Sequence, residues 1–199
     1  GHDALLYNTG SNNIAIGRAS SYYNTSGTQN LGIGFQAGHF NSTGSNNTLV
    51  GFRSGYGVTA NSNSNNTGLG YQSLTAVTTG SNNIAVGYNA ADNLTSGTKN
   101  IVIGYDIDVP TATGSNQLSI GNLIFGTGLT GSGTTAAGKV GILNNAPDST
   151  LDVSGGLKVT GGVRFSGIPN GGTSSDSLLV ATSTGDVKKI NNSFASGIH

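Results

Sequence analysis

The sequence predicts an all-β fold, a parallel β-solenoid made of short coils. A turn-like cluster of Thr, Gly, Ser and Asn runs into an apolar triplet and a glycine, first as TGSNNIAIG at residues 9–17 and again as TGSNNIAVG at residues 79–87. Within the triplet, aliphatic residues alternate with a small one, which is the period of a strand. No stretch shows the 3.6-residue period of a helix.

The glycine that follows each triplet recurs in seven copies, at intervals of 17 residues with a single interval of 19. Chance similarity does not keep phase over seven copies, so the chain is a repeat array. The unit is too short for a propeller blade and fits one coil of a solenoid. These glycines, here called the key glycines, are Gly17, Gly34, Gly51, Gly70, Gly87, Gly104 and Gly121.

Other positions of the unit form columns when the coils are stacked. The aliphatic pair of each triplet should form one apolar stripe, and the small residue between the pair should lie on the opposite face, where another backbone can approach. A glycine seven residues before the key glycine, in six of seven copies, predicts a turn with positive φ. Asparagines directly before the triplets predict a hydrogen-bonded ladder. Five aromatic residues after the key glycines should stack over one corner: Phe35, Phe52, Tyr71, Tyr88 and Tyr105.

Composition excludes several classes of protein. Only 34% of the 199 residues are hydrophobic and 8% are charged, against roughly half and a quarter in a typical globular domain. The 34 glycines lack the every-third spacing of collagen. The formal net charge is zero, without the basic patch of a nucleic-acid partner. There is no cysteine for a disulfide or a thiolate metal site, and no apolar run predicts membrane insertion by this fragment.

The segments NNIAIG, NNIAVG and KNIVIG resemble the head repeat of YadA-like trimeric autotransporter adhesins. The resemblance implies a homotrimeric left-handed parallel β-roll, with a larger outer loop here because the period is longer. It directs Ala15, Gly17, Ala85 and Gly87 toward the trimer axis. The residues that it places inside the roll are Ile14, Ile16, Ile84, Val86, Ile101 and Ile103.

A second resemblance begins after the array. Residues 139–165 resemble the segment that precedes an endosialidase-type intramolecular chaperone in phage tail fibres and bacterial surface fibres, which implies an interleaved β stalk. Residues 177–190 predict a hairpin, since two strand-like runs flank a Ser-Thr-Gly-Asp turn. We therefore divide the chain into a tag remnant and lead-in at 1–7, the array at 8–125, a Gly/Thr-rich linker at 126–138 and a β-rich stalk at 139–199.

Nothing in the sequence supports catalysis, and we expect no enzyme, no cofactor and no metal. Asp106 and Asp108 are the one close carboxylate pair; alternating on a strand they would share a face that binds a cation or acts on a sugar, but a solvated strand end is the simpler interpretation. His2, His39 and His199 have no metal-ligand spacing. No serine has the context of a nucleophile.

Four aromatic residues lie in loops outside the repeat pattern, and they are the candidate receptor-binding residues: Tyr22, Tyr23, Phe40 and Tyr56. Rings beside Asn and Ser can stack on sugars, although they can equally cover a thin core or seams between chains. The sequence thus favours a structural and adhesive module of an extracellular homotrimeric fibre, on a bacterial surface or a phage tail, with a cell-surface glycan or other receptor. The alternative is a monomeric ice- or surface-binding solenoid, in which the small-residue face would have no packing role.

Overall fold

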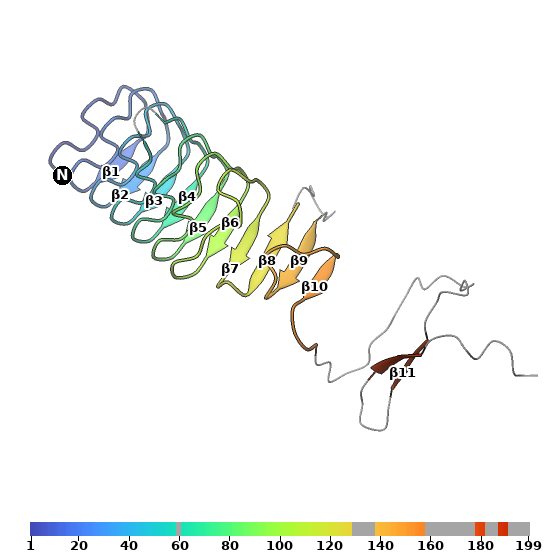
Figure 1. The fold of residues 1–199 in the computed structure, drawn as a ribbon. Helices are drawn as coiled ribbons and strands as arrows, with labels where there is room; N and C mark the ends of the chain where they lie inside the picture. The colour runs from blue at the N-terminus through green and yellow to red at the C-terminus, as the bar shows by residue number, and fades with distance from the viewer. Residues whose placement is uncertain (59–60, 129–137, 158–177, 182–186, 191–199) are drawn as a thin grey trace, which may run out of the picture. The chain divides into compact units, whose positions relative to one another are not determined.

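The strands of the array, seven of three residues each, lie side by side along one edge of a coiled chain (Figure 1). The computed structural model describes residues 1–58, 61–128, 138–157, 178–181 and 187–190. The seven strands occupy the seven predicted triplets and each pairs in parallel with the next, so the predicted β-solenoid is confirmed, with about six turns. No helix occurs in these residues. The strands are β1 (Ile14–Ile16), β2 (Leu31–Ile33), β3 (Thr48–Val50), β4 (Thr67–Leu69), β5 (Ile84–Val86), β6 (Ile101–Ile103) and β7 (Leu118–Ile120).

The sheet continues beyond the array through three more strands. β8 (Ile124–Thr127) turns back antiparallel to β7, β9 (Lys139–Ile142) is antiparallel to β8, and β10 (Leu151–Val153) is parallel to β9. The ten strands form one sheet in sequence order. Residues 139–157 therefore belong to the same compact unit as the array, while positions 129–137 of the expected linker lie outside the described residues.

The hairpin predicted near the C-terminus is confirmed for its two strands. In the second unit, residues 158–199, β11 (Leu178–Ala181) pairs antiparallel with β12 (Val187–Ile190). The predicted turn between them falls outside the part of the chain that the structure describes, as does His199.

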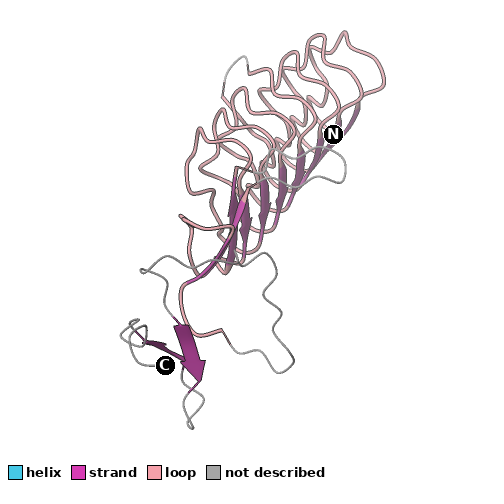
Figure 2. Ribbon diagram, turned by 90° about the vertical axis from the view of Figure 1, so that its right-hand side faces the viewer, coloured by secondary structure: helices cyan, strands magenta, loops and turns pink. Residues whose placement is uncertain are grey.

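The strands present their aliphatic pairs to the outside of the coil, and the interior assignment made from the resemblance is wrong. The exposed fraction of Ile14 is 56% and that of Ile84 is 41%, whereas Ala85 and Val102 between such pairs are completely buried. Ala85 and its counterparts face the interior of their own coil, not a neighbouring chain. Figure 2 shows the strands gathered on one side of the coil and the turns on the other.

Small interior residues are required because the outer turn of each coil packs directly against its strand. A Cβ added to Gly32 would lie 2.6 Å from Ser20 Oγ, and one added to Gly68 would lie 2.6 Å from Ser54 Oγ. The two alternate faces of a three-residue strand are equally available in principle. The room left by the turn decides which side chains enter: in most coils the strand residue that enters is small, and Leu49 is admitted where the turn carries Gly55.

The interior changes character along the array. The first three coils bury mainly serine and asparagine side chains. Beyond them the interior is an apolar cluster, made by Leu74, Val77, Ala85, Ala90, Ala91, Leu94, Val102, Ile107 and Val109.

The glycines seven residues before the key glycines allow adjacent coils to approach each other closely. The positive φ expected at these glycines occurs at other residues. A Cβ added to Gly10 or Gly44 would collide with the carbonyl oxygen of Gly27 or Asn63 in the next coil. None of these column glycines has a positive φ. The left-handed residues come two positions later, with φ between 57° and 61°. They are Asn12, Gln29, Asn46, Asn65, Asn82, Lys99 and Asn116.

The asparagine ladder is confirmed. Asn83 donates from its backbone N and from Nδ2 to Asn66 Oδ1, at 2.9 and 3.1 Å, and Asn100 repeats both contacts onto Asn83. Each Nδ2 also reaches a backbone carbonyl, as Asn83 does to Gly97 at 3.0 Å. The ladder satisfies buried backbone groups that a turn without regular structure would leave unpaired.

Residues 1–7 lie on the first coil as a partial turn. Leu5 N donates to Ser20 O at 3.1 Å, and Ala19 N donates to His2 O at 2.9 Å. A Cβ on Gly1 would lie 2.7 Å from the carbonyl carbon of Gly17, so the two glycines stack as the key glycines do. The segment expected as a tag remnant and lead-in thus follows the path of the repeat.

Candidate functional site

The structure brings the four predicted loop aromatics into one cluster. Tyr22 and Tyr56 are the fifth residues after their key glycines, Tyr23 and Phe40 the sixth, so they form two adjacent columns on the outer turns of the first three coils. The ring centroids of Tyr23 and Phe40 are 5.2 Å apart with parallel planes, and those of Phe40 and Tyr56 are 5.0 Å apart edge to face.

Two members of this aromatic cluster were missed by sequence reasoning. His39 lies between Tyr22 and Tyr56, with its ring stacked at 5.2 Å from one and 5.4 Å from the other. Tyr7 of the partial turn stacks on Tyr23 at 5.7 Å. The 17-residue spacing that connects Tyr22, His39 and Tyr56 would have identified His39, whereas Tyr7 is 16 residues before Tyr23 and escapes a strict period.

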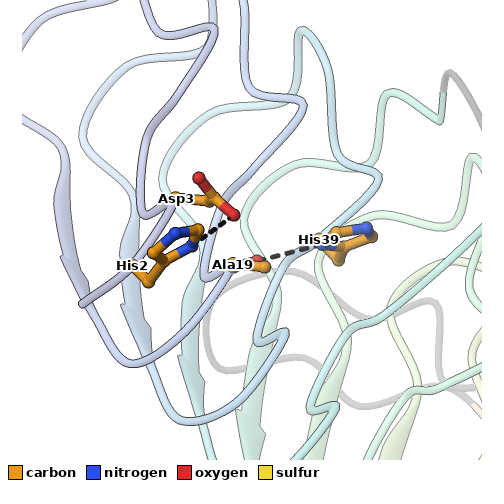
Figure 3. A network of polar contacts seen from close by, with 4 residues as sticks. All are labelled: His2, Asp3, Ala19 and His39. Atoms are coloured by element: carbon orange, nitrogen blue, oxygen red, sulfur yellow. Dashed lines mark hydrogen bonds and ion pairs between the residues drawn. The ribbon is translucent and has the colours of Figure 1, made fainter.

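His39 has a structural role in the cluster. Its Nδ1 donates to the carbonyl oxygen of Ala19 at 2.9 Å, and its ring is buried (Figure 3). Burial lowers the pKa of His39 below its usual value, and the nearby Arg53 charge acts in the same direction. His2 lies on the opposite side of Ala19 from His39 and pairs with its neighbour Asp3 (Figure 3). The two histidines therefore do not share a site.

The Tyr22 hydroxyl also depends on its neighbours. A hydrogen bond with the Tyr7 side chain raises the pKa of Tyr22 above its ordinary value, and desolvation adds to the effect. The Tyr22 phenol therefore stays neutral near neutral pH and can both donate and accept a hydrogen bond.

Arg53 borders the cluster and carries its positive charge. The guanidinium carbon lies 5.0 Å from the ring centroid of Tyr56 and 5.5 Å from that of Phe52. Its Nε donates to Gln36 Oε1 at 2.9 Å. Within the described ranges, the only ion pair is that of His2 with Asp3, so no carboxylate of these residues neutralises Arg53.

A separate column of aromatic residues, directly after the key glycines, stacks as predicted. Phe35, Phe52, Tyr71, Tyr88 and Tyr105 follow one another at 5.0 to 5.1 Å with nearly parallel planes. Arg18 covers the outer face of Phe35 at 5.9 Å. Tyr105 ends the column and is 74% exposed.

Stacking within the columns limits what the rings can bind. A ring held face to face between two others offers only its edge and polar atoms to a ligand, and a sugar stacks on a free face. Most ring faces in the aromatic cluster and in the separate column after the key glycines are already covered by the rings of adjacent coils. Ligand contact at the cluster must therefore depend on its terminal rings, its hydroxyls and Arg53.

The aspartates do not form the strand pair that the sequence suggested. Asp106 and Asp108 lie in the outer turn after β6, not on a strand, and both are exposed. Asp106 Oδ1 accepts from Asn89 Nδ2 at 3.1 Å, and Asp108 Oδ1 accepts from the backbone N of Asn93 at 3.2 Å. Burial, and then the charge of Asp108, raises the pKa of Asp92 to about 6.

Neither a metal site nor a membrane-spanning helix is found in the described part of the chain. No three His or Asp side chains there are arranged to hold a metal ion. No helix among these residues has the length and apolarity to cross a bilayer.

Comparison with protein-family models, with curated proteins and with solved structures gives no match.

Proposed function

We propose that this chain is a structural and adhesive module of a homotrimeric surface fibre, in which three left-handed β-rolls pack their aliphatic sheet faces around a common axis. The observation that carries the proposal is the outward face of the ten-stranded sheet, here called the aliphatic face. It runs through the sheet register from β1 to β10 as Ile14/Ile16, Leu31/Ile33, Thr48/Val50, Thr67/Leu69, Ile84/Val86, Ile101/Ile103, Leu118/Ile120, Ile124/Gly126, Val140/Ile142 and Leu151/Val153.

An aliphatic face of this length calls for a partner surface. Ten strands at about 4.8 Å give a largely apolar strip roughly 43 Å long. Soluble monomers rarely expose continuous apolar rows of this size. The aliphatic pairs have no room inside, because the coil interior is already filled by the residue between each pair, by side chains of the outer turns and by the asparagine ladder. A closed arrangement of identical copies covers the strip without leaving an edge exposed.

The adhesive part of the proposal rests on the outer turns. The aromatic cluster and Arg53 belong to the outer turns and not to the strands, so packing through the aliphatic face does not use them. A receptor on a cell surface, a glycan in our proposal, would be held there or by a tip that the fibre presents. In the phage alternative, the same module is a receptor-binding segment of a tail fibre. In both, the interleaved stalk of the proposed fibre begins after residue 157, because β9 and β10 belong to the sheet of the array.

The mass of the particle in solution tests the assembly. Light scattering after gel filtration should give three times the 19.8 kDa of one chain. A single-chain mass at micromolar concentration would overturn the trimer, and a two-chain mass would replace it by a face-to-face dimer.

A pair of variants assigns the interface to the aliphatic face. Val86→Asp places a charge in the middle of that face and should reduce the mass to one chain. Ser96→Asp is the matched control, because Ser96 is an exposed outer-turn residue, and it should leave the mass unchanged. Equal masses for both variants would show that another surface joins the chains.

The small-residue column cannot distinguish a fibre module from an ice-binding monomer, because it faces the coil interior in either case. The aliphatic face distinguishes these two functions. An ice-binding solenoid needs a flat polar surface, but the outward sheet face here carries threonine at only two of its paired positions, Thr48 and Thr67. Thermal hysteresis measured on the protein should therefore be absent, and a clear effect would favour the alternative.

A further inference from the structure

We propose that Arg53 and the rings beside it form a binding site for a carboxylated sugar, a uronic or sialic acid residue of a glycan. This inference deepens the proposed adhesive function and rests on it for the choice of a glycan. It replaces a general aromatic platform by a site with a defined charge, centred on a residue that the sequence did not single out.

The guanidinium of Arg53 is held in a fixed position. Phe52 and Tyr56 lie within 5.5 Å of it, and the bond from Nε to Gln36 Oε1 sets the plane of the fork. The two terminal nitrogens have no protein acceptor within the described residues. A planar fork restrained in this way loses little entropy when it binds a carboxylate through two parallel bonds.

The surrounding charge favours an anion. In the first three coils the charged side chains are Arg18, Arg53 and Asp3, and Asp3 is paired with His2. The acidic residues of the array gather two to three coils away, at Asp92, Asp106 and Asp108. An anionic ligand at Arg53 therefore meets no repulsion from a nearby carboxylate of the described coils.

The rings beside Arg53 favour a sugar over a simple anion. Tyr56 and Phe40 are the last aromatic residues of their two columns, since Thr75 and Gly57 follow them in the next coil. The two rings meet edge to face at 5.0 Å, and the Arg53 guanidinium lies over the ring of Tyr56. A pyranose ring carrying a carboxylate presents an apolar C–H face and an anion close together. That combination matches terminal aromatic rings that lie next to an arginine guanidinium.

A substitution with a precedent in the fold tests the site. Arg53 has a φ of 52°, and glutamine occupies the same column position in the coils before and after it, Gln36 and Gln72, with φ of 54° and 52°. Arg53→Gln should therefore fold normally. Arg53→Lys keeps the positive charge but loses the planar guanidinium group. Arg18→Gln removes the other arginine of the first three coils and is the matched control.

Binding is measured on the whole purified protein by isothermal calorimetry with two matched pairs of probes, sialyllactose against lactose and trigalacturonate against its methyl ester. We expect the acidic member of at least one pair to bind more than about tenfold tighter than its neutral partner. Arg53→Gln and Arg53→Lys should lose that preference, and Arg18→Gln should keep it. Equal binding within both pairs, or full binding by Arg53→Gln, would overturn the site.

Two further outcomes separate the site from its context. An oligo-aspartate peptide that binds as tightly as the acidic sugars would overturn the choice of a glycan and indicate an acidic protein partner. Light scattering on the same samples separates the two proposals: a trimer without acid preference leaves the fibre module standing and removes the site, whereas a monomer that prefers the acidic sugars removes the trimer and supports the site.

Discussion

Leu49 occupies the space that Gly55 leaves free within the same coil. A Cβ added to Gly55 would lie 2.6 Å from both Leu49 Cδ1 and Cδ2. In the next coil the sizes are exchanged, with Gly68 on the strand and Leu74 in the outer turn, both buried. Strand and turn thus share one interior volume, and a large residue on one side requires a small one on the other.

Gly55→Ala should destabilise the protein by about 2–4 kcal/mol, because the added methyl overpacks against Leu49 and φ is 57°. Chemical denaturation followed by circular dichroism measures the loss. Gly121→Ala is the matched control, since φ is 58° there but nothing lies within 4 Å of the added Cβ, and it should cost about 1 kcal/mol. Equal losses would mean that backbone strain alone matters and that the shared volume is unimportant.

Asn83→Ala should interrupt the asparagine ladder. The variant leaves the backbone N of Asn100 and the carbonyl of Gly97 without their partners inside the coil. Because these groups are buried, we expect a loss of about 3 kcal/mol in the free energy of unfolding. Thr79→Ala, at an exposed turn residue without a side-chain hydrogen bond in the structure, is the control and should stay within about 0.5 kcal/mol of the parent. A small effect at Asn83 would show that water replaces the ladder.

The aromatic column predicts unequal effects for two chemically identical changes. Tyr88 stacks on both Tyr71 and Tyr105 at 5.0 Å, whereas Tyr105 stacks on Tyr88 alone. Each stacked pair contributes about 0.5–1.5 kcal/mol, so Tyr88→Ala should cost about twice as much as Tyr105→Ala. Thermal unfolding of the two variants side by side measures the difference. Indistinguishable midpoints would argue against a stabilising column.

Stability should fall as the pH rises from about 4 to about 6, through the carboxyl of Asp92. Burial raises its pKa from 3.8 to about 6, so the folded chain keeps a proton at Asp92 that the unfolded chain has already lost. Since the folded state binds more protons in this interval, deprotonation disfavours folding. Asp92→Asn has no proton to lose, so its melting temperature should rise relative to that of the parent as the pH increases from 4 to 7. A constant difference across this range would contradict the raised pKa.

Much of the array follows from the sequence. Seven strands, their parallel register, the asparagine ladder and the stacked aromatic column all come from one fact, the 17-residue period. Equivalent residues of a parallel solenoid must lie one strand spacing apart, so a column in the alignment becomes a column in space. His39 belonged to such a column and could have been predicted with Tyr22 and Tyr56.

Only the tertiary structure decided which face of the strands is inside. Alternation in a triplet such as Ile84-Ala85-Val86 separates two faces without saying which is buried, because the answer depends on the room left by an outer turn several residues later. The closeness of Ser20 to Gly32 settles it: the outer turn fills the interior up to the middle residue of the triplet, and the aliphatic pairs face outward. Arg53 became a candidate for the same reason, since its fixed position depends on Phe52, Tyr56 and Gln36, which meet only when the coils are stacked.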